Sequence, residues 1–387
     1  MPPMFFCAMM RCACLPLLRP GSPRKARLIL IHLCLVSLLL SQCRPALSEQ
    51  WWGRKLAPGV DYYHIKMGTP QWPNHVHVLK IDVRDSRRLI RPLLAYDHIG
   101  RLEKVSQMCH RTTALAAVNG SFYISNKNPP LPIGLVMLDG KVLQKTKLLR
   151  TTLGIKSDGQ AIIGIPRIRY DIKLPEKTKR LQLWGINRPR KQDEVVLYTP
   201  EYGRTTRTNR YGLEVLVVGD RVVQKSSSNT VIPHDGFVIS FHGQSRYIRD
   251  WFELGDRVLR SFELSDGWAD VYHALSGGPR LVVDGEVSVT HAAENFGRSY
   301  RSPNPRTAVG TAPDGQLLFV VVDGRQPGYS VGLTFPELGR LMVRMGARDA
   351  MGLDSGGSSV MVVKGQVVNS PSDGRERRVS NGIGVFR

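Results

Sequence analysis

The residues best suited to chemistry lie in one short stretch near the C-terminus, Ala350-Met-Gly-Leu-Asp-Ser-Gly-Gly-Ser-Ser359. An apolar segment leads into Asp354, and only serine and glycine follow it up to Ser359. Small residues let the backbone approach a ligand closely, and successive N–H groups in such a loop can form an anion-binding concavity. The stretch therefore predicts a carboxylate at a strand end beside an anion-binding loop. A plain flexible turn is the alternative interpretation.

Other stretches also combine polar residues with glycine or proline at the ends of apolar runs. They supply these candidates: Asn119, Gly277, Gly278, Arg306, Asp323, Asp373, Glu376 and Asn381. Arg306 and Asp323 flank a hairpin turned at Asp314-Gly315, so their side chains could come close. A guanidinium fork binds phosphate or carboxylate well. The alternatives are a structural Arg–Asp pair, and for Asn119 an ordinary turn asparagine before Gly120.

Several familiar chemistries are not indicated. The part of the chain after the leader has no His-Glu-x-x-His, Cys-x-x-Cys, G-x-S-x-G or P-loop motif. Its histidines are dispersed, and His75-x-His77 on one side of a strand is only a weak pattern for a metal. We therefore predict no cofactor and no metal site, although clustered aspartates could hold an ion.

Turn signals predict a chain dominated by antiparallel strands. Two-residue pairs that contain glycine separate short apolar runs, and such pairs are the strongest local signal for a hairpin. They are Asp139-Gly140, Asp158-Gly159, Gly219-Asp220, Asp284-Gly285, Asp314-Gly315 and Lys364-Gly365. The expected fold class is α+β, with mixed and antiparallel sheets and a few packed helices.

Two helices are expected, over residues 102–112 and 334–346. The second begins with the capping-box pattern Thr334-Phe-Pro-Glu337, and its methionines at helical spacing indicate core packing. Each helix precedes an apolar strand that ends in a polar residue, Asn119 in one case and Asp354 in the other. If the two halves are related, these residues occupy equivalent strand ends and could face one cleft.

The first 48 residues predict a secretory leader. They contain no acidic residue, and a basic cluster at residues 24–27 precedes thirteen uncharged, mostly apolar residues, 28–40. Cleavage is expected after Ser48, and an uncleaved leader would tether the protein to a membrane. Residues 49–387 would form one large domain, with the polar, basic segment 167–270 as a β-rich insertion within it. Five of the six cysteines lie in the leader, which leaves Cys109 without an intrachain partner.

The charge narrows the range of partners. The formal net charge is +22, but the basic residues are mostly scattered singly, and no nucleic-acid-binding module is present. For an exported protein, the charge favours acidic glycans, teichoic-type polymers or an anionic membrane surface. We predict no nucleic-acid partner, and a generally solvated basic surface remains the simpler alternative.

At the candidate stretches the chain resembles the phosphodiester glycosidase family, over about residues 56–386. The motifs that carry the resemblance are Ala117-Val-Asn-Gly-Ser-Phe122, Gly277-Gly-Pro279, Pro305-Arg-Thr-Ala-Val-Gly310, Val322-Asp-Gly-Arg325, Leu353-Asp-Ser-Gly-Gly-Ser-Ser359 and Pro371-Ser-Asp373, with Glu376 and Asn381. They are specific as a set. Ser355 stands where the family commonly has Gly, and Arg378 where Pro is frequent.

The resemblance implies hydrolysis of the bond between an anomeric carbon and a phosphodiester oxygen. It places Asp354, Asp323 and Arg306 in the chemistry, with the choice between the two aspartates left open. The substrate-binding residues implied are Asn119, Gly277, Gly278, Gly356, Gly357, Ser358, Ser359, Asp373, Glu376 and Asn381. The expected substrate is a GlcNAc-1-phosphodiester-like unit of an envelope or extracellular polysaccharide, in the periplasm or outside the cell. A non-catalytic protein that binds anionic glycans is the alternative.

Overall fold

The computed structural model describes residues 49–83, 90–297 and 301–386. The predicted leader lies outside them. The predicted α+β class is confirmed, because strands dominate and two α-helices, α2 (Val105–Thr112) and α3 (Phe335–Arg344), pack against sheets within this part of the chain. Both helices fall within their expected ranges, and the capping box between Thr334 and Glu337 forms as predicted.

The sheet that we call the β3 sheet holds the strands that lead to Asp354. Its order is β1 (Gln50–Ala57), β2 (Val60–Thr69), β3 (Trp72–Asp82), β22 (Gln316–Val322), β21 (Arg306–Thr311), β23 (Asp349–Gly352), β19 (Arg280–Val283) and β20 (Glu286–Val287). The β5 sheet is smaller and contains the strands around Asn119. Its order is β25 (Gln366–Val367), β24 (Met361–Val363), β5 (Ala116–Asn119), β26 (Asn381–Val385) and β4 (Ile90–Leu94).

Two further sheets contain the remaining strands. The β7 sheet has the order β15 (Arg221–Ser226), β14 (Gly212–Val218), β16 (Gly236–His242), β13 (Val195–Tyr198), β12 (Gly185–Ile186), β7 (Lys141–Lys145), β6 (Leu135–Leu138), β18 (Val271–Ser276), β8 (Thr152–Lys156) and β9 (Ala161–Gly164). The β10 sheet has the order β11 (Lys179–Gln182), β10 (Ile168–Leu174) and β17 (Leu259–Leu264). All the hairpins predicted from glycine-containing turns form.

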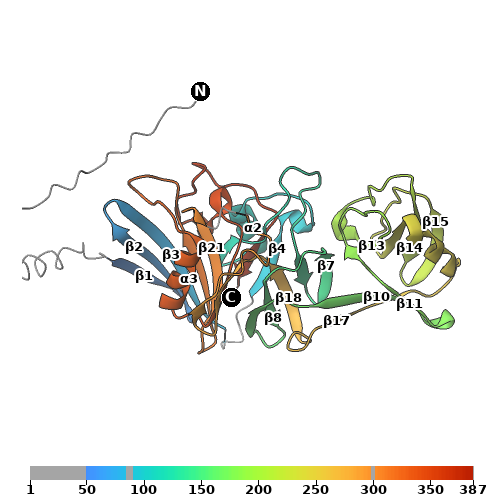
Figure 1. Cartoon of the computed structure of the whole chain (residues 1–387), viewed down its shortest axis with the longest axis horizontal. Helices are drawn as coiled ribbons and strands as arrows, with labels where there is room; N and C mark the ends of the chain where they lie inside the picture. Colours follow the sequence, from blue (N-terminus) through green and yellow to red (C-terminus); the bar gives the residue numbers. More distant parts are fainter. Residues whose placement is uncertain (1–48, 84–89, 298–300, 387) are drawn as a thin grey trace, which may run out of the picture. The chain divides into compact units, whose positions relative to one another are not determined.

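The β3 and β5 sheets share a core, and each has a helix on its other side. In β22, Leu317, Phe319 and Val321 belong to the shared core, whereas the intervening Leu318 and Val320 pack in the cluster that contains α3. Successive side chains of a strand point to opposite faces, so an unbroken apolar run indicates a strand covered on both sides. Figure 1 shows α3 beside β21, and α2 contacts β5, β24 and β26.

Candidate active site

The Asp354 loop carries the chain from one sheet into the other. The chain leaves the β3 sheet at the end of β23, forms a short 3-10 turn over Gly356–Ser358, and enters the β5 sheet at β24. Backbone bonds hold the loop from both sides: the amide of Asp354 donates to Gly120 O at 2.9 Å, and that of Gly356 donates to Pro305 O at 2.9 Å. The loop is therefore a fixed crossover and not a flexible turn.

Asn119 lies at the end of β5 and contacts this loop directly. Its Nδ2 donates to the carbonyl oxygen of Asp354 at 2.7 Å. Its Oδ1 accepts from Thr307 Oγ1 at 2.7 Å and from the amide of Val360 at 3.1 Å. The two strand ends are therefore side by side, but the amide of Asn119 is occupied by protein groups. This contact pattern favours a role in holding the loop.

Asp354 is a half-buried carboxyl group with few hydrogen bonds. Its Oδ1 accepts from the amide of Ser355 at 2.9 Å. Loss of water raises the pKa of Asp354 to about 6, and the neighbouring Ser358, the Ser355 amide and the Arg377 charge oppose that rise without cancelling it. A carboxyl group with a pKa near neutrality can accept or donate a proton at physiological pH.

Tyr123 is a neighbour of Asp354 that the sequence analysis did not select as a site residue. Burial raises the pKa of Tyr123, the Asp354 charge raises it further, and Arg377 and Ser358 lower it. Its hydroxyl donates to the carbonyl oxygen of Arg378 at 3.2 Å. Tyr123 directly follows the motif Ala117–Phe122, and this position was the signal in the sequence that could have identified it.

Asp373 and Arg377 form an ion pair over the glycines of the loop. Arg377 Nη2 lies 2.7 Å from Asp373 Oδ2, and both side chains are partly exposed. A Cβ added at Gly357 would lie 2.2 Å from Arg377 Nη2 and 2.3 Å from the Asp373 carboxylate. Gly357 therefore leaves the space that this pair occupies. Arg377, another residue not selected from the sequence, brings a cation to the site.

Some buried polar atoms at this site have no hydrogen-bond partner among the residues that the structure describes. They are Ser358 Oγ, Ser359 Oγ and Asn381 Nδ2. Ser358 Oγ lies close enough to Asp354 and Tyr123 to affect the pKa of both, yet it makes no hydrogen bond of ordinary geometry. Buried polar groups are normally paired, so unpaired ones are where a ligand or water would bind.

Arg306 lies on β21, where its described contacts are with Leu333, Ser302 and Phe335. Its side chain is buried, its Nε donates to Leu333 O at 2.8 Å, and its guanidinium lies 3.9 Å from the ring centroid of Phe335. Burial, with a smaller effect of the Arg325 charge, lowers the pKa of Arg306 to about 10. Arg306 is paired across the hairpin with Val322, and the described contacts include no ion pair with Asp323.

Arg325 is the cation that the β21–β22 hairpin brings to the loop. Gly356 has a φ of +68°, and a Cβ there would meet Arg325 Nη2 at 3.0 Å. Arg325 Nε also donates to Asn304 Oδ1 at 2.8 Å. Arg325 has a positive φ of 60°, a backbone conformation found in turns. Its side chain nevertheless lies beside the Asp354 loop.

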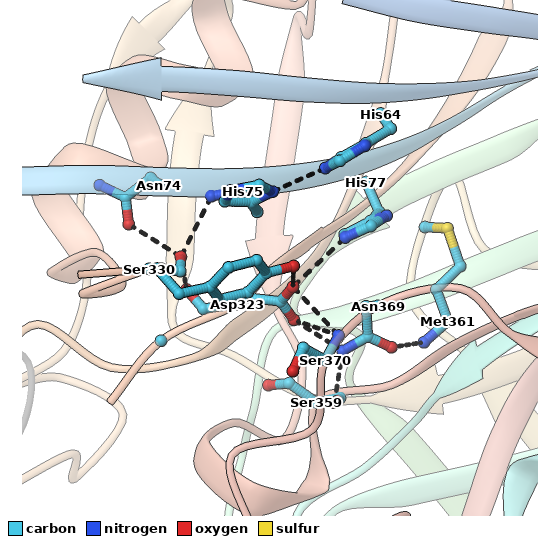
Figure 2. A network of polar contacts seen from close by, with 12 residues as sticks. His64, Asn74, His75, His77, Asp323, Ser330, Ser359, Met361, Asn369 and Ser370 are labelled. Carbon is cyan, nitrogen blue, oxygen red and sulfur yellow. Dashed lines mark hydrogen bonds and ion pairs between the residues drawn. The ribbon is translucent and has the colours of Figure 1, made fainter. Parts of the chain in front are cut away.

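Asp323 is buried within a network of donors (Figure 2). Its carboxylate accepts from Asn369 Nδ2 at 2.9 Å and from the amide of Ser370 at 3.0 Å. His77 Nε2 and the Tyr329 hydroxyl each lie 3.3 Å from Oδ2. Asn369 Nδ2 also contacts Ser359 O at 3.3 Å, so Asp323 supports the segment that follows the Asp354 loop.

Histidines of β2 and β3 complete the Asp323 network. His77 Nδ1 lies 2.8 Å from the Tyr62 hydroxyl, and His64 Nε2 lies 2.9 Å from His75 Nδ1. Burial lowers the pKa of His75, and burial with the nearby imidazoles lowers that of His64 to about 4. Among the described residues, no group of three or more His, Cys, Asp or Glu has the arrangement of a metal site.

The remaining predicted residues pack around this region. Gly277 and Gly278 lie against β23, since the amide of Gly278 donates to Gly352 O at 2.8 Å, and a Cβ on Gly278 would lie 2.3 Å from Glu294 Oε2. Glu376 does not point into the site: its carboxylate accepts from the amide and hydroxyl of Ser106, in the first turn of α2. It acts there as a helix cap.

A family model and two relatives match parts of the chain. Residues 211–386 match the model of the phosphodiester glycosidase family. The SPbeta prophage-derived protein YomE of Bacillus subtilis (strain 168) is 42% identical over 76 residues. The N-acetylglucosamine-1-phosphodiester alpha-N-acetylglucosaminidase of Bos taurus is 32% identical over 109 residues. The matches cover 20% and 26% of this chain but only 12% and 20% of those relatives.

Solved structures share the fold over most of the chain. A hypothetical protein from Synechocystis superposes with a TM-score of 0.77 at 20% identity, covering 87% of this chain and 64% of that one. A protein of Burkholderia pseudomallei K96243 that is described as exported gives a TM-score of 0.75 at 23% identity, covering 89% and 97%. The match over residues 211–386 confirms the resemblance to the phosphodiester glycosidase family, in the part of the chain that carries Arg306, Asp323 and Asp354.

Proposed function

We propose that this protein is an exported hydrolase that cleaves a sugar-1-phosphodiester and releases the free sugar and a phosphomonoester. The observation that carries the proposal is Asp354, a carboxyl group of raised pKa among the unpartnered polar atoms of Ser358, Ser359 and Asn381. Arginines 325 and 377 lie beside the same loop. A carboxylate, two cations and unpartnered polar groups are thus gathered around the Asp354 loop.

The chemistry of the reaction fits this set of groups. In the net reaction, the oxygen of water becomes bonded to the anomeric carbon, and the bond from that carbon to the phosphodiester oxygen breaks with its electron pair on that oxygen. The proton that water loses passes to the Asp354 carboxylate and then to solvent. The leaving phosphomonoester is a stable anion with a second pKa near 6, so it needs little protonation. One carboxylate and several cations should therefore suffice to catalyse cleavage of the sugar–phosphate bond. Ordinary glycoside hydrolysis uses two carboxyl groups.

Each residue receives a role from its position. Asp354 would act as the nucleophile or as the base that activates water, and Arg325 and Arg377 would stabilise the leaving phosphate. Ser358 and Asn381 would bind sugar hydroxyls or phosphate oxygens. Asp323 and Arg306, which are engaged elsewhere, would position the loop and the β21–β22 hairpin.

The proposed substrate is a GlcNAc-1-phosphodiester unit in an envelope or secreted polysaccharide. The basic surface favours an anionic polymer, and the relative from Bos taurus is named for a GlcNAc-1-phosphodiester. Export is supported by the leader pattern in residues 24–48 and by the Burkholderia neighbour described as exported. Within the described residues, no helix has the length and apolar content of a bilayer span.

The test is an assay of products from the methyl diester of GlcNAc-1-phosphate. The wild-type protein should release free GlcNAc and methyl phosphate, and Asp354→Asn should lose at least about 100-fold in kcat, the size expected for a lost acid–base or nucleophilic group. Asp314→Asn is the matched control, since Asp314 lies in the exposed β21–β22 turn and Asn can keep its bond to the Gln316 amide. Unchanged turnover in Asp354→Asn would remove Asp354 from the chemistry. Binding without any product would instead favour a non-catalytic glycan-binding protein.

A further inference from the structure

A second candidate site lies in a cavity of about 640 Å³ beside β7, β8 and β11, which we call the Arg150 cavity. Its lining contains cations and no acidic residue: Lys145, Lys147, Arg150 and Arg167. The volume is in the usual range for a small-molecule site. None of the acidic candidates for the chemistry borders it, so the cavity is separate from the residues around Asp354.

Arg150 is the feature that indicates a ligand. Its side chain is only 8% exposed, and its Nε and Nη1 have no hydrogen-bond partner among the residues that the structure describes. The guanidinium lies 3.8 Å from the ring centroid of Phe296, which covers one face but accepts no in-plane hydrogen bond. Burial lowers the pKa of Arg150. A guanidinium removed from water with free donors is expected to bind an oxyanion.

Glu294, whose charge acts on Arg150, makes no described hydrogen bond to it. Glu294 raises the pKa of Arg150 through its charge, yet the described contacts include no hydrogen bond or ion pair between them. The Glu294 carboxylate instead accepts from the amide and hydroxyl of Thr151, at 2.7 Å each. It also accepts from the amide of Arg280 at 2.9 Å. The carboxylate therefore fixes the main chain next to Arg150 and leaves the guanidinium available.

An aromatic surface lies in the same lining. Trp184 is 50% exposed, and Lys147 Nζ lies 4.3 Å from its ring centroid. Lys147 also pairs with Glu194 at 2.9 Å, which holds the ammonium in place. An exposed indole with a cation beside it offers an apolar face and a charge together. A pyranose ring with an attached phosphate would match them, since the ring can pack on the indole and the phosphate can pair with the cation.

Hydrogen bonds link the lining of the cavity to the segment that leads to Tyr123. Ser276 lines the cavity, its carbonyl oxygen accepts from Ser121 Oγ at 2.7 Å, and the following Gly277 bonds through its amide to Thr151 O at 2.9 Å. Two residues beyond Ser121 is Tyr123, the neighbour of Asp354. The cavity and the Asp354 region are therefore held by connected segments of the chain.

We infer that the Arg150 cavity binds a phosphate-bearing sugar unit of the polymer whose sugar–phosphate bond is cleaved at Asp354. Arg150 and Lys147 contact the phosphate, and Trp184 packs against the sugar ring. The inference rests on the proposed function for the identity of the polymer. The cavity would be a second contact for the polymer, so a polymer of several sugar-phosphate units should bind more tightly than a single unit.

The experiment measures binding calorimetrically in the Asp354→Asn background, so that turnover does not consume the probe. The probe is a synthetic tetramer of GlcNAc joined through 1-phosphodiester links, and chitotetraose is its uncharged match. Arg150→Gln and Trp184→Ala should each weaken binding of the tetramer at least about 10-fold. Trp72→Ala is the control, since Trp72 is 63% exposed at the β2–β3 turn and does not line the cavity. Trp184→Ala keeps the test decisive if Arg150→Gln fails to fold.

The outcomes separate this inference from the proposed function. Cavity-dependent binding of the tetramer supports the inference even if the wild-type protein cleaves no diester, in which case only the proposed function fails. Turnover of the methyl diester with full-strength tetramer binding by Trp184→Ala and Arg150→Gln overturns the inference and leaves the function intact. Chitotetraose that binds as tightly as the tetramer also overturns it, because an anion is then not what the cavity recognises.

Discussion

Asn119 Nδ2 donates a 2.7 Å hydrogen bond to the carbonyl oxygen of Asp354, joining the end of β5 to the loop that leaves β23. The two residues are 235 positions apart in the chain. The contact fixes the main chain at Asp354 and leaves the carboxyl group of that residue free to face Ser358 and Arg377. A residue of the β5 sheet, Asn119, thus fixes the main-chain conformation of Asp354, which follows a strand of the β3 sheet.

Replacement of Asn119 by alanine should destabilise the protein by about 3 kcal/mol, because it leaves buried groups of Asp354, Thr307 and Val360 without partners. Chemical denaturation would measure the change. The exposed Asn126→Ala variant should stay within about 0.5 kcal/mol of wild type. A loss of activity in Asn119→Ala with unchanged stability would mean that Asn119 binds substrate.

The pKa of Asp354 predicts opposite pH effects on activity and stability. If Asp354 acts ionised, kcat/KM should rise with pH through a midpoint of about 6. Because the folded pKa lies above the ordinary value of 3.8, this group favours folding most at low pH, and its contribution falls as pH rises through 6. Asp354→Asn should therefore gain stability relative to wild type above pH 6. The gain should be about 1 kcal/mol, since the carboxyl is partly exposed. A pH-independent difference would contradict the shift.

Replacement of Gly357 by alanine should reduce activity while the fold is retained. The new Cβ would meet the ends of the Arg377 and Asp373 side chains, which can move aside. The substitution should therefore disrupt this ion pair and leave the packing of the core unchanged. Turnover of the methyl diester and thermal unfolding, measured together, test this. The Gly297→Ala variant, whose Cβ meets no atom within 4 Å, is the control. Equal activity in both variants would show that the Asp373–Arg377 pair is dispensable.

Glu376→Ala should lower stability by about 1 kcal/mol, the usual cost of losing a helix N-terminal cap. The carboxylate binds the Ser106 amide at 2.8 Å, so the first turn of α2 loses its acceptor. KM for the methyl diester should not change. The exposed Glu286→Ala variant on β20 provides the comparison. A raised KM without a stability change would restore Glu376 to the substrate site.

Asp323→Asn tests whether the Asp323 carboxylate takes part in the reaction or only holds the neighbouring segment in place. The amide of asparagine would face the donors of Ser370 and Asn369, at a cost of about 2 kcal/mol. Activity should fall because residues 369–373 shift, but the rise of kcat/KM with its midpoint of about 6 should remain. Asp158→Asn, in the β8–β9 turn, is the matched control. Loss of the pH dependence in Asp323→Asn would assign the reacting carboxylate to Asp323.

Local residue patterns alone specify the individual hairpins and helix starts. Glycine-containing pairs such as Asp314-Gly315 specify hairpins because they adopt turn conformations that other residues avoid, and Thr334 with Glu337 specifies a helix start through its own side-chain bonds. The motifs around Asp354 also carry the resemblance to the phosphodiester glycosidase family, because residue types in order are all that such a resemblance requires.

The contacts of each candidate side chain, in contrast, depend on how the sheets pack together. Arg306 and Arg325 look equivalent in sequence, but the alternation of β21 turns Arg306 toward Phe335, whereas the turn after β22 brings Arg325 to Gly356. Asp323 and Asp354 look equally suited to chemistry, yet donors from four other residues surround the first. Contacts between residues hundreds of positions apart depend on how the sheets pack, and no local pattern encodes that packing. For the same reason, no sequence pattern identified Tyr123, Arg377 or Arg150 as site residues.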